Sequence, residues 1–185
     1  VPKVSKGGDG TTAFILFKNG GNDIMFDSRI SIVDTKGLIF SSTIESVNEI
    51  PPDSFASTSF DISASPQLAS GGYRPTVQIR YQDFAGVEKI ETFELMVNVT
   101  KMLTAVDLSA PEDLELGQNV ILRAKILDEN GQPVSGQNVV FKLDSTVLGS
   151  AVTNGLGEAT LSYLVEAKAG SYTLSAQFAG SDIHE

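Results

Sequence analysis

Apolar and polar residues alternate with a period of two along most of this chain. Four segments carry the pattern most clearly: 77–81, 93–97, 118–127 and 172–178. Successive side chains of a strand point to opposite sides, so alternation with β-branched and aromatic residues predicts half-buried strands. Helical spacing is not sustained anywhere, and its best short segment, 48–54, is interrupted by Pro51.

Turn sequences separate these runs and set the number of strands. Asn130-Gly131 and Asn154-Gly155 supply the backbone conformations that tight turns need. The second half then contains six strands, near 103–109, 118–127, 137–143, 147–152, 158–164 and 171–179. This spacing predicts an all-β protein built from immunoglobulin-like Greek-key sandwiches. A seven-strand sandwich needs one more strand after Gly180, so we expect the second sandwich to lack its last strand and 171–179 to present an open edge.

Length predicts two domains, because a β-sandwich needs about 100 residues and the chain has 185. We place the boundary between 1–101 and 102–185, where one strand ends and another begins. Each half has a tyrosine before a late strand, Tyr73 and Tyr172. Such a tyrosine either hydrogen-bonds back to the backbone at a sheet corner or is an ordinary strand-start residue.

Charge and composition exclude several classes of partner. The formal net charge is −10, which repels phosphate backbones and anionic membranes, so we expect no nucleic-acid binding. No apolar run reaches the roughly 20 residues of a membrane span. The chain has no cysteine and no signal peptide, and we interpret it as a piece of a longer protein.

The sequence contains no recognisable combination of a catalytic nucleophile and a base. His184 is the single histidine, one residue from the end, where we expect it to be solvated. No G-x-S-x-G elbow is present to activate a serine. We therefore predict that the chain is not an enzyme and has no catalytic or cofactor-binding residues.

Calcium is the one metal that the sequence allows us to consider. Asp128, Glu129 and Asn130 cluster oxygen atoms in one turn, but calcium needs six to eight ligands, more than one turn supplies. Further oxygen donors near the domain junction are Asp107, Glu112 and Asp113. We expect solvated turn carboxylates, no cofactor, and at most a weak effect of calcium.

Two surface chemistries remain. Asn98 lies in the only N-x-[ST] sequence, and alternation places it on the outward side, so it is a candidate for glycosylation. The chain has no tryptophan and 4 tyrosines, which leaves little material for a sugar-stacking platform. We expect the aromatic residues to lie in the core.

The second half resembles a prokaryotic immunoglobulin-like repeat of the invasin and adhesin kind. The matching segments are 116–118, 131–136, 139–141, 152–154, 157–161, 170–172 and 178–180. In that family a G-x-P-V-x-G loop joins two strands, and a T-N-x-x-G-x-A turn leads into the next. The chain departs from the family after Gly180, where the last strand should follow.

Residues 1–101 more weakly resemble a repeat of archaeal surface-layer-like proteins, related to the cell-adhesion-related (CARDB-like) domains. The matching segments are 17–21, 72–73 and 77–86, which follow a K-N-x-G first strand and a late G-x-Y … Y-x-D-x-x-G hairpin. Pro51-Pro52-Asp53 replaces the usual Pro-Gly before the later strand.

Both resemblances imply non-catalytic structural or adhesive modules of a larger protein at the cell surface, outside the cell. The implied partners are neighbouring repeats of the same chain, and a cell-surface protein or polysaccharide. The alternative is a pair of accessory, polysaccharide-binding domains of a secreted surface enzyme.

Overall fold

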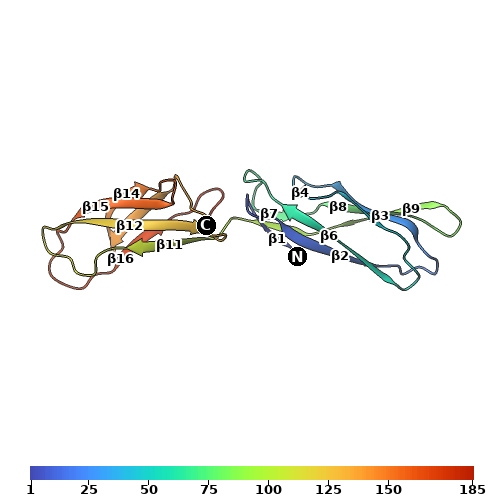
Figure 1. Ribbon diagram of the computed structural model, residues 1–185, viewed down its shortest axis with the longest axis horizontal. Helices are drawn as coiled ribbons and strands as arrows, with labels where there is room; N and C mark the ends of the chain where they lie inside the picture. The colour runs from blue at the N-terminus through green and yellow to red at the C-terminus, as the bar shows by residue number, and fades with distance from the viewer. The chain divides into compact units, whose positions relative to one another are not determined.

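The structure is a computed structural model that describes residues 1–185. The chain divides into two compact units, Val1–Lys101 (unit 1) and Met102–Glu185 (unit 2). Both are all-β, immunoglobulin-like sandwiches made of strands and turns (Figure 1). None of the secondary structure is a helix that could cross a membrane.

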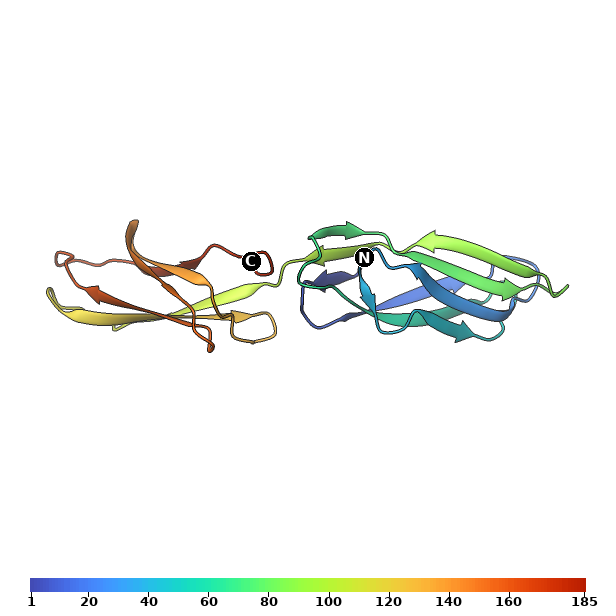
Figure 2. The same ribbon diagram turned by 90° about the horizontal axis from the view of Figure 1, so that it is seen from above.

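Unit 1 contains ten strands. They are β1 (Lys3–Ser5), β2 (Thr11–Lys18), β3 (Phe26–Asp34), β4 (Ile39–Phe40), β5 (Ile44–Val47), β6 (Phe55–Ser63), β7 (Gly71–Tyr73), β8 (Thr76–Gln82), β9 (Glu88–Glu94) and β10 (Val97–Thr100). One sheet has the order β5-β3-β8-β9 and the other β2-β6-β4, with a small third sheet of order β1-β10-β7. Figure 2 shows β8 and β9 in one layer and β2 and β6 in the other.

The core of unit 1 follows from the period of two in its strands. Ile30 and Val77 are fully buried where β3 and β8 pair, and Phe60 is buried on β6 opposite them. The ring of Phe60 meets that of Phe40 edge to face, with centroids 6.3 Å apart. Each large buried side chain contributes about 2–3 kcal/mol of transfer free energy to the stability of this core.

The alternation in 93–97 predicts one continuous strand, but the structure divides this segment between two strands. Phe93, Leu95 and Val97 do face inward, but β9 ends at Glu94 and β10 begins at Val97. The reason is a change of partner, since β9 pairs with β8 whereas β10 pairs with β1 and β7. The alternation of inward and outward side chains nevertheless continues across this change of partner.

Unit 2 contains six strands, close to the six that the sequence predicts. They are β11 (Thr104–Ser109), β12 (Asn119–Asp128), β13 (Asn138–Leu143), β14 (Thr146–Val152), β15 (Glu158–Leu164) and β16 (Leu174–Phe178). They form two three-stranded sheets, of orders β11-β12-β15 and β14-β13-β16. Leu122 and Ile126 from the first sheet meet Val139 and Phe141 from the second, and all four are fully buried.

β16 is an edge strand that pairs with β13 alone, in agreement with the expected open edge. The sequence does not predict what the residues after Gly180 do. Met102 and His184 form a parallel bridge, in which Met102 N donates to Ile183 O at 2.8 Å and Glu185 N donates to Met102 O at 2.9 Å. These residues therefore lie beside the start of β11 rather than beside β16.

Both units contain the tyrosine corner that the sequence offers as one alternative. The Tyr73 hydroxyl donates to the carbonyl of Ala69 at 2.8 Å, and the Tyr172 hydroxyl donates to the carbonyl of Lys168 at 3.0 Å. Each bond spans four residues and ties a loop to the strand that follows it.

Replacing Tyr73 or Tyr172 by phenylalanine should lower the stability of the corresponding unit by about 1 kcal/mol, because the ring stays and one hydrogen bond is lost. Urea unfolding of each variant measures the change. As a control, Tyr163→Phe removes the hydroxyl of a half-buried tyrosine of unit 2 outside this corner. If Tyr172→Phe is no less stable than that control, the corner bond adds nothing in water.

Candidate functional site

The carboxylates of Asp128 and Glu129 accept hydrogen bonds from backbone N–H groups. Asp128 Oδ1 accepts hydrogen bonds from Asn130 N at 2.9 Å and from Gln132 N at 2.8 Å. Glu129 Oε2 accepts one from Leu103 N at 3.3 Å. Aspartate commonly caps a turn in this way, because its short side chain reaches the backbone two residues on.

The other oxygen donors do not join this turn. Asp128 pairs with Thr104 at the start of β11, whereas Glu112 and Asp113 follow its end. A strand of six residues spans about 20 Å, so these carboxylates lie at opposite ends of unit 2. Asp107 is exposed on β11 between them. No group of three or more acidic or histidine side chains is arranged to hold a metal ion.

Calcium at about 5 mM should raise the melting temperature by no more than about 2 °C, because no set of oxygen atoms converges. Differential scanning calorimetry with calcium, and with magnesium as the control ion, measures this. A calcium-specific rise of more than about 10 °C would require a site that these turns do not explain.

Asn98 lies on β10, between Lys3 of β1 and Gly72 of β7. Its side chain is half-buried, whereas the flanking Val97 and Val99 are buried, so it is on the outward side of this small sheet. Glycosylation of Asn98 stays a prediction.

The sequence predicts that His184 is freely solvated, but in the structure this residue is half-buried. Its ring Nδ1 lies 3.3 Å from the hydroxyl of Ser181, and that hydroxyl accepts a hydrogen bond from His184 N at 3.1 Å. The cause is the bridge to Met102, which holds this segment against β11.

Not all aromatic residues lie in the core, and here the expectation from the sequence is wrong. Phe14, Phe55 and Phe84 have exposed fractions of 78%, 63% and 80%. Phe84 is at the tip of the β8–β9 turn, but Phe14 and Phe55 are on adjacent strands of one sheet.

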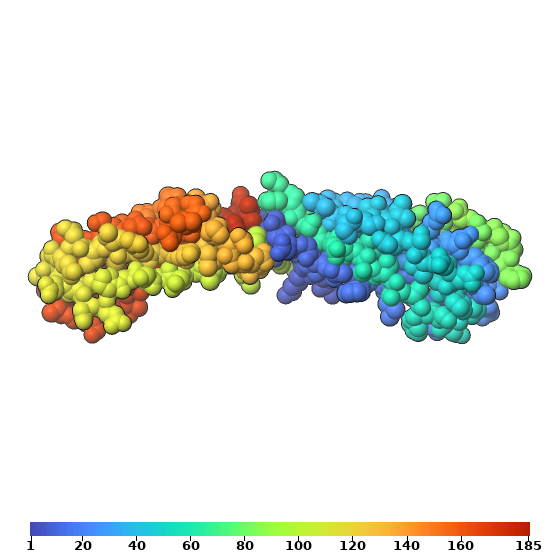
Figure 3. Space-filling model, in the orientation of Figure 1, coloured from blue at the N-terminus to red at the C-terminus, as the bar shows by residue number.

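These two rings belong to a surface that we call the β2–β6 face. It is the outer side of β2 and β6 and consists of Thr12, Phe14, Leu16, Lys18, Phe55, Ser57, Ser59 and Asp61. Leu16 is 67% exposed, and serines stand opposite both Phe14 and Leu16. The short serine side chains leave Phe14 and Leu16 projecting above the sheet. The two strands lie side by side on unit 1 in Figure 3, in blue and teal.

Charges stand only at the two ends of the β2–β6 face. At one end Lys18 Nζ bonds Asp53 Oδ1 at 2.8 Å and lies 6.0 Å from the centre of the Phe55 ring. At the other, the Thr12 hydroxyl donates to Asp61 Oδ1 at 2.6 Å. The middle is uncharged and exposes Phe14 and Leu16 beside two serines, which suits contact with another apolar or aromatic surface.

The sequence of β2 carries a signal for this face in addition to its strand pattern. In 11–18 both phases of the alternation are apolar, Ala13 and Ile15 inward and Phe14 and Leu16 outward. A half-buried strand should have a polar outer side, so two apolar phases indicate a second contact surface.

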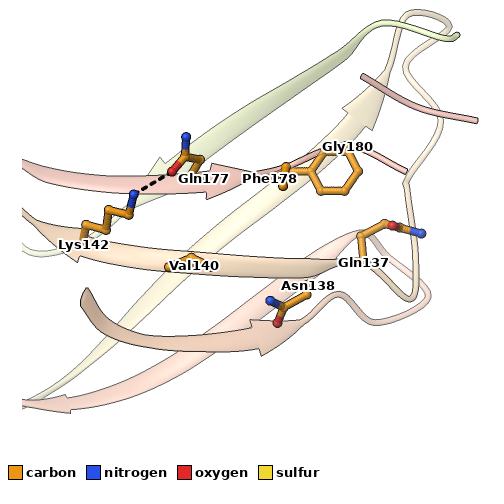
Figure 4. Close-up of a pocket in the computed structure, with 8 residues that line it drawn as sticks. Gln137, Asn138, Val140, Lys142, Gln177, Phe178 and Gly180 are labelled. Atoms are coloured by element: carbon orange, nitrogen blue, oxygen red, sulfur yellow. Dashed lines mark hydrogen bonds between the residues drawn. The ribbon is translucent and has the colours of Figure 1, made fainter. Parts of the chain in front are cut away.

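Unit 2 has two hollows, one shallow and one deeper. The shallow one, about 260 Å³, lies over β13 and β16, where Lys142 Nζ donates to Gln177 Oε1 at 2.7 Å (Figure 4). The deeper one, about 450 Å³, is lined mainly by apolar side chains such as Leu122 and Leu174, with Glu112 and Lys168 among its polar residues. Neither lining contains a serine, threonine or histidine.

Hydrogen bonding between Asp34 and Lys36, in the turn after β3, lowers the pKa of the aspartate and raises that of the lysine. Two further groups with shifted pKa values belong to the β8–β9 hairpin. The N–H of Val87, with further bonds from Ala85 and Lys89, lowers the pKa of Asp83. Burial, with the carboxylate of Glu91 beside it, raises the pKa of Tyr81. Both shifts belong to the packing of a turn and a strand rather than to a reactive site.

Comparison with known families gives one match, which lies within unit 2. Residues 106–185 match the model of the bacterial Ig-like domain (group 3). No curated protein matches the chain. The finer resemblances, of residues 1–101 to surface-layer-like and CARDB-like repeats and of unit 2 to invasin and adhesin repeats, stay predictions.

Solved structures that resemble the chain share little sequence with it. A putative membrane anchored protein from Corynebacterium diphtheriae is 17% identical, with a TM-score of 0.41 over 96% of this chain and 47% of that one. The CupB2 chaperone of Pseudomonas aeruginosa is 10% identical, with a TM-score of 0.32 over 97% of both chains. The major pilin subunit BcpA of Bacillus cereus is 11% identical, with a TM-score of 0.30 over 91% of this chain and 48% of that one. This chain thus spans about half the length of the first and third of these proteins.

By its sequence match and its two packed sheets, unit 2 is an immunoglobulin-like domain.

Proposed function

We propose that the chain is a pair of non-catalytic, immunoglobulin-like modules of a larger protein at the cell surface, and that its role is structural and adhesive. The observation that carries the adhesive part is the β2–β6 face. Phe14, Leu16 and Phe55 together expose apolar side chains on the outer side of the β2-β6-β4 sheet, and single modules seldom expose such neighbours without a partner.

The structural part of the proposal is supported by how each unit is held together. The hydrophobic cores, the tyrosine corners and the turn-capping aspartates all fix two small sandwiches in one conformation. Rigid sandwiches of this kind position a surface without chemistry of their own.

Leu16→Ser should reduce attachment of chain-coated beads to their target surface by about tenfold, since one contact leucine contributes about 1.5 kcal/mol. Beads are offered surfaces coated with the chain itself, with cell-surface protein or with polysaccharide. The matched control is Leu156→Ser, because Leu156 is 64% exposed on a turn of unit 2. Attachment that is equal for both variants would refute an adhesive role of the face.

The polysaccharide surface tests the alternative function. Phe14 and Phe55 could stack against sugar rings, as accessory domains of surface enzymes do. Attachment to polysaccharide alone, lost in Leu16→Ser, would favour such an accessory domain over an adhesive module.

A further inference from the structure

The outer edge of β2 is unpaired along its whole length. β2 is the end strand of the β2-β6-β4 sheet and pairs with β6 through eight consecutive residues without a bulge. Natural edge strands are usually protected by charge, proline, bulges or short length. β2 has none of these before Lys18.

The edge of the opposite sheet shows the contrast. β9 ends that sheet and carries Glu88, Lys89, Glu91 and Glu94 in seven residues, with six of its seven positions exposed. Charged side chains of this density keep an edge from pairing with another molecule. Of these two edge strands, β9 is protected by charge and β2 is not.

The backbone of β2 is ready to accept a strand. Asn19 N donates to Ser54 O at 3.0 Å, on the β6 side. Donors alternate along an antiparallel strand, so the N–H groups of Phe14 and Leu16 point away from β6, toward the open edge. These are the same residues whose side chains project on the β2–β6 face.

We propose, resting on the adhesive function above, that the partner of this edge is a second copy of the chain. Two β2 strands pair antiparallel about a two-fold axis at Ile15. Phe14 of one copy then stands opposite Leu16 of the other in a hydrogen-bonded pair, twice by symmetry. The two β2–β6 faces become one continuous apolar surface across the joined sheets.

Charge complementarity selects a second copy as the occupant. In this register Lys18 of one copy stands opposite Thr12 of the other, whose hydroxyl bonds Asp61. No like charges face each other along the strand, although the chain has a net charge of −10. Lys18 is bound to an exposed Asp53, and such surface ion pairs exchange at little cost.

Two variants that each reverse the charge at one end of the β2–β6 face, Lys18→Glu and Asp61→Lys, test the proposal. Sedimentation equilibrium should show concentration-dependent dimers of the wild-type chain, with a dissociation constant of about 1 μM to 1 mM. Lys18→Glu places a new carboxylate near Asp61 of the other copy, and Asp61→Lys places a second ammonium group near Lys18, so each variant alone should dimerise about tenfold more weakly. An equimolar mixture pairs opposite charges at both ends and should dimerise within about threefold of the wild type.

The control variant is Lys36→Glu, which breaks a comparable exposed ion pair with Asp34 outside the face. The side chains of Lys36 and Lys18 are 48% and 46% exposed. The Lys36→Glu variant should dimerise with the same dissociation constant as the wild type. Circular dichroism melts check that every variant is folded.

Two results would overturn the inference. One is a chain that stays monomeric at the highest concentration reached. The other is a mixture that dimerises no better than its single variants. If Leu16-dependent attachment to protein or polysaccharide persists in either case, the adhesive or accessory role stands and only the identity of the partner is wrong.

Discussion

Gly157→Ala should destabilise unit 2 by about 4 kcal/mol, because both the backbone angle and the space at this position exclude a side chain. The φ angle of Gly157 is +75°, and an added Cβ would lie 2.5 Å from the carbonyl oxygen of Ile126. An alanine costs about 1–2 kcal/mol for the left-handed conformation and about 1–3 kcal/mol for the overlap.

The backbone around Gly157 cannot move aside cheaply. Gly157 O accepts a hydrogen bond from Ile126 N at 2.9 Å, and Ile126 O accepts one from Val134 N at 3.0 Å. The Thr153 hydroxyl fastens the same region by donating to Val134 O at 2.8 Å. A shift that relieves the overlap would break this set of bonds, and a small domain has only about 5–15 kcal/mol of stability to lose.

Gly155→Ala is the matched control for this prediction. Gly155 lies two residues away in the same turn, has no positive φ, and has no atom within 4 Å of an added Cβ. Urea unfolding followed by residue-resolved hydrogen exchange separates unit 2 from unit 1. If the two alanine variants have equal stability, the close approach of Gly157 to Ile126 does not exist in solution.

The strands of unit 2 could be predicted closely because each runs between turn residues of unambiguous type. The structure moves the predicted 118–127 by one residue, to Asn119–Asp128, and shortens 171–179 to Leu174–Phe178. The latter contraction has a tertiary cause. Thr173 N bonds Asp144 Oδ1 at 2.7 Å, a partner 29 residues away that no local pattern reveals.

The motifs of unit 2 can be recognised as loops from the sequence, but not as one interlocked structure. The G-x-P-V-x-G loop contributes Val134, and the T-N-x-x-G turn contributes Thr153 and Gly157. Thr153 joins them with two side-chain bonds, to Val134 O and from Gln137 N. A sequence places such loops along the chain, and only the packing of the sheets brings them together.

The candidate sites could be predicted less well than the strands. Asp128 has the residue type of a calcium ligand and also of a turn cap, and the two interpretations differ only in where its oxygen atoms point. The outward phase of β2, with Phe14 and Leu16, is visible in the sequence. Its pairing with the serines of β6 is not, because register across strands far apart in the chain is a property of the fold.

The second large effect is expected at Asn19, the buried polar residue that directly follows β2. Its side-chain Nδ2 donates to Asp23 O and Ile50 O, both at 2.8 Å, and its Oδ1 accepts from Gly21 N at 3.0 Å. The residue is 5% exposed, so water cannot replace these partners without opening the loop. Asn19→Ala should therefore destabilise unit 1 by about 3 kcal/mol, about 1 kcal/mol for each lost bond.

Asn19→Asp provides a sharper version of the same prediction. The new carboxylate keeps the acceptor for Gly21 but faces the carbonyl oxygens of Asp23 and Ile50, which raises its pKa in the folded state above its unfolded value. Folded protein then binds the proton more tightly, so stability is regained at low pH and lost as pH rises through that pKa. Urea unfolding between about pH 4 and pH 7, where a carboxyl with a raised pKa titrates, measures how the free energy of unfolding changes with pH. Asn22→Ala, an exposed residue of the same loop, is the control and should leave stability within about 0.5 kcal/mol of the wild type. An Asn19→Asp variant with the pH profile of the wild type would show that the amide does not hold the loop.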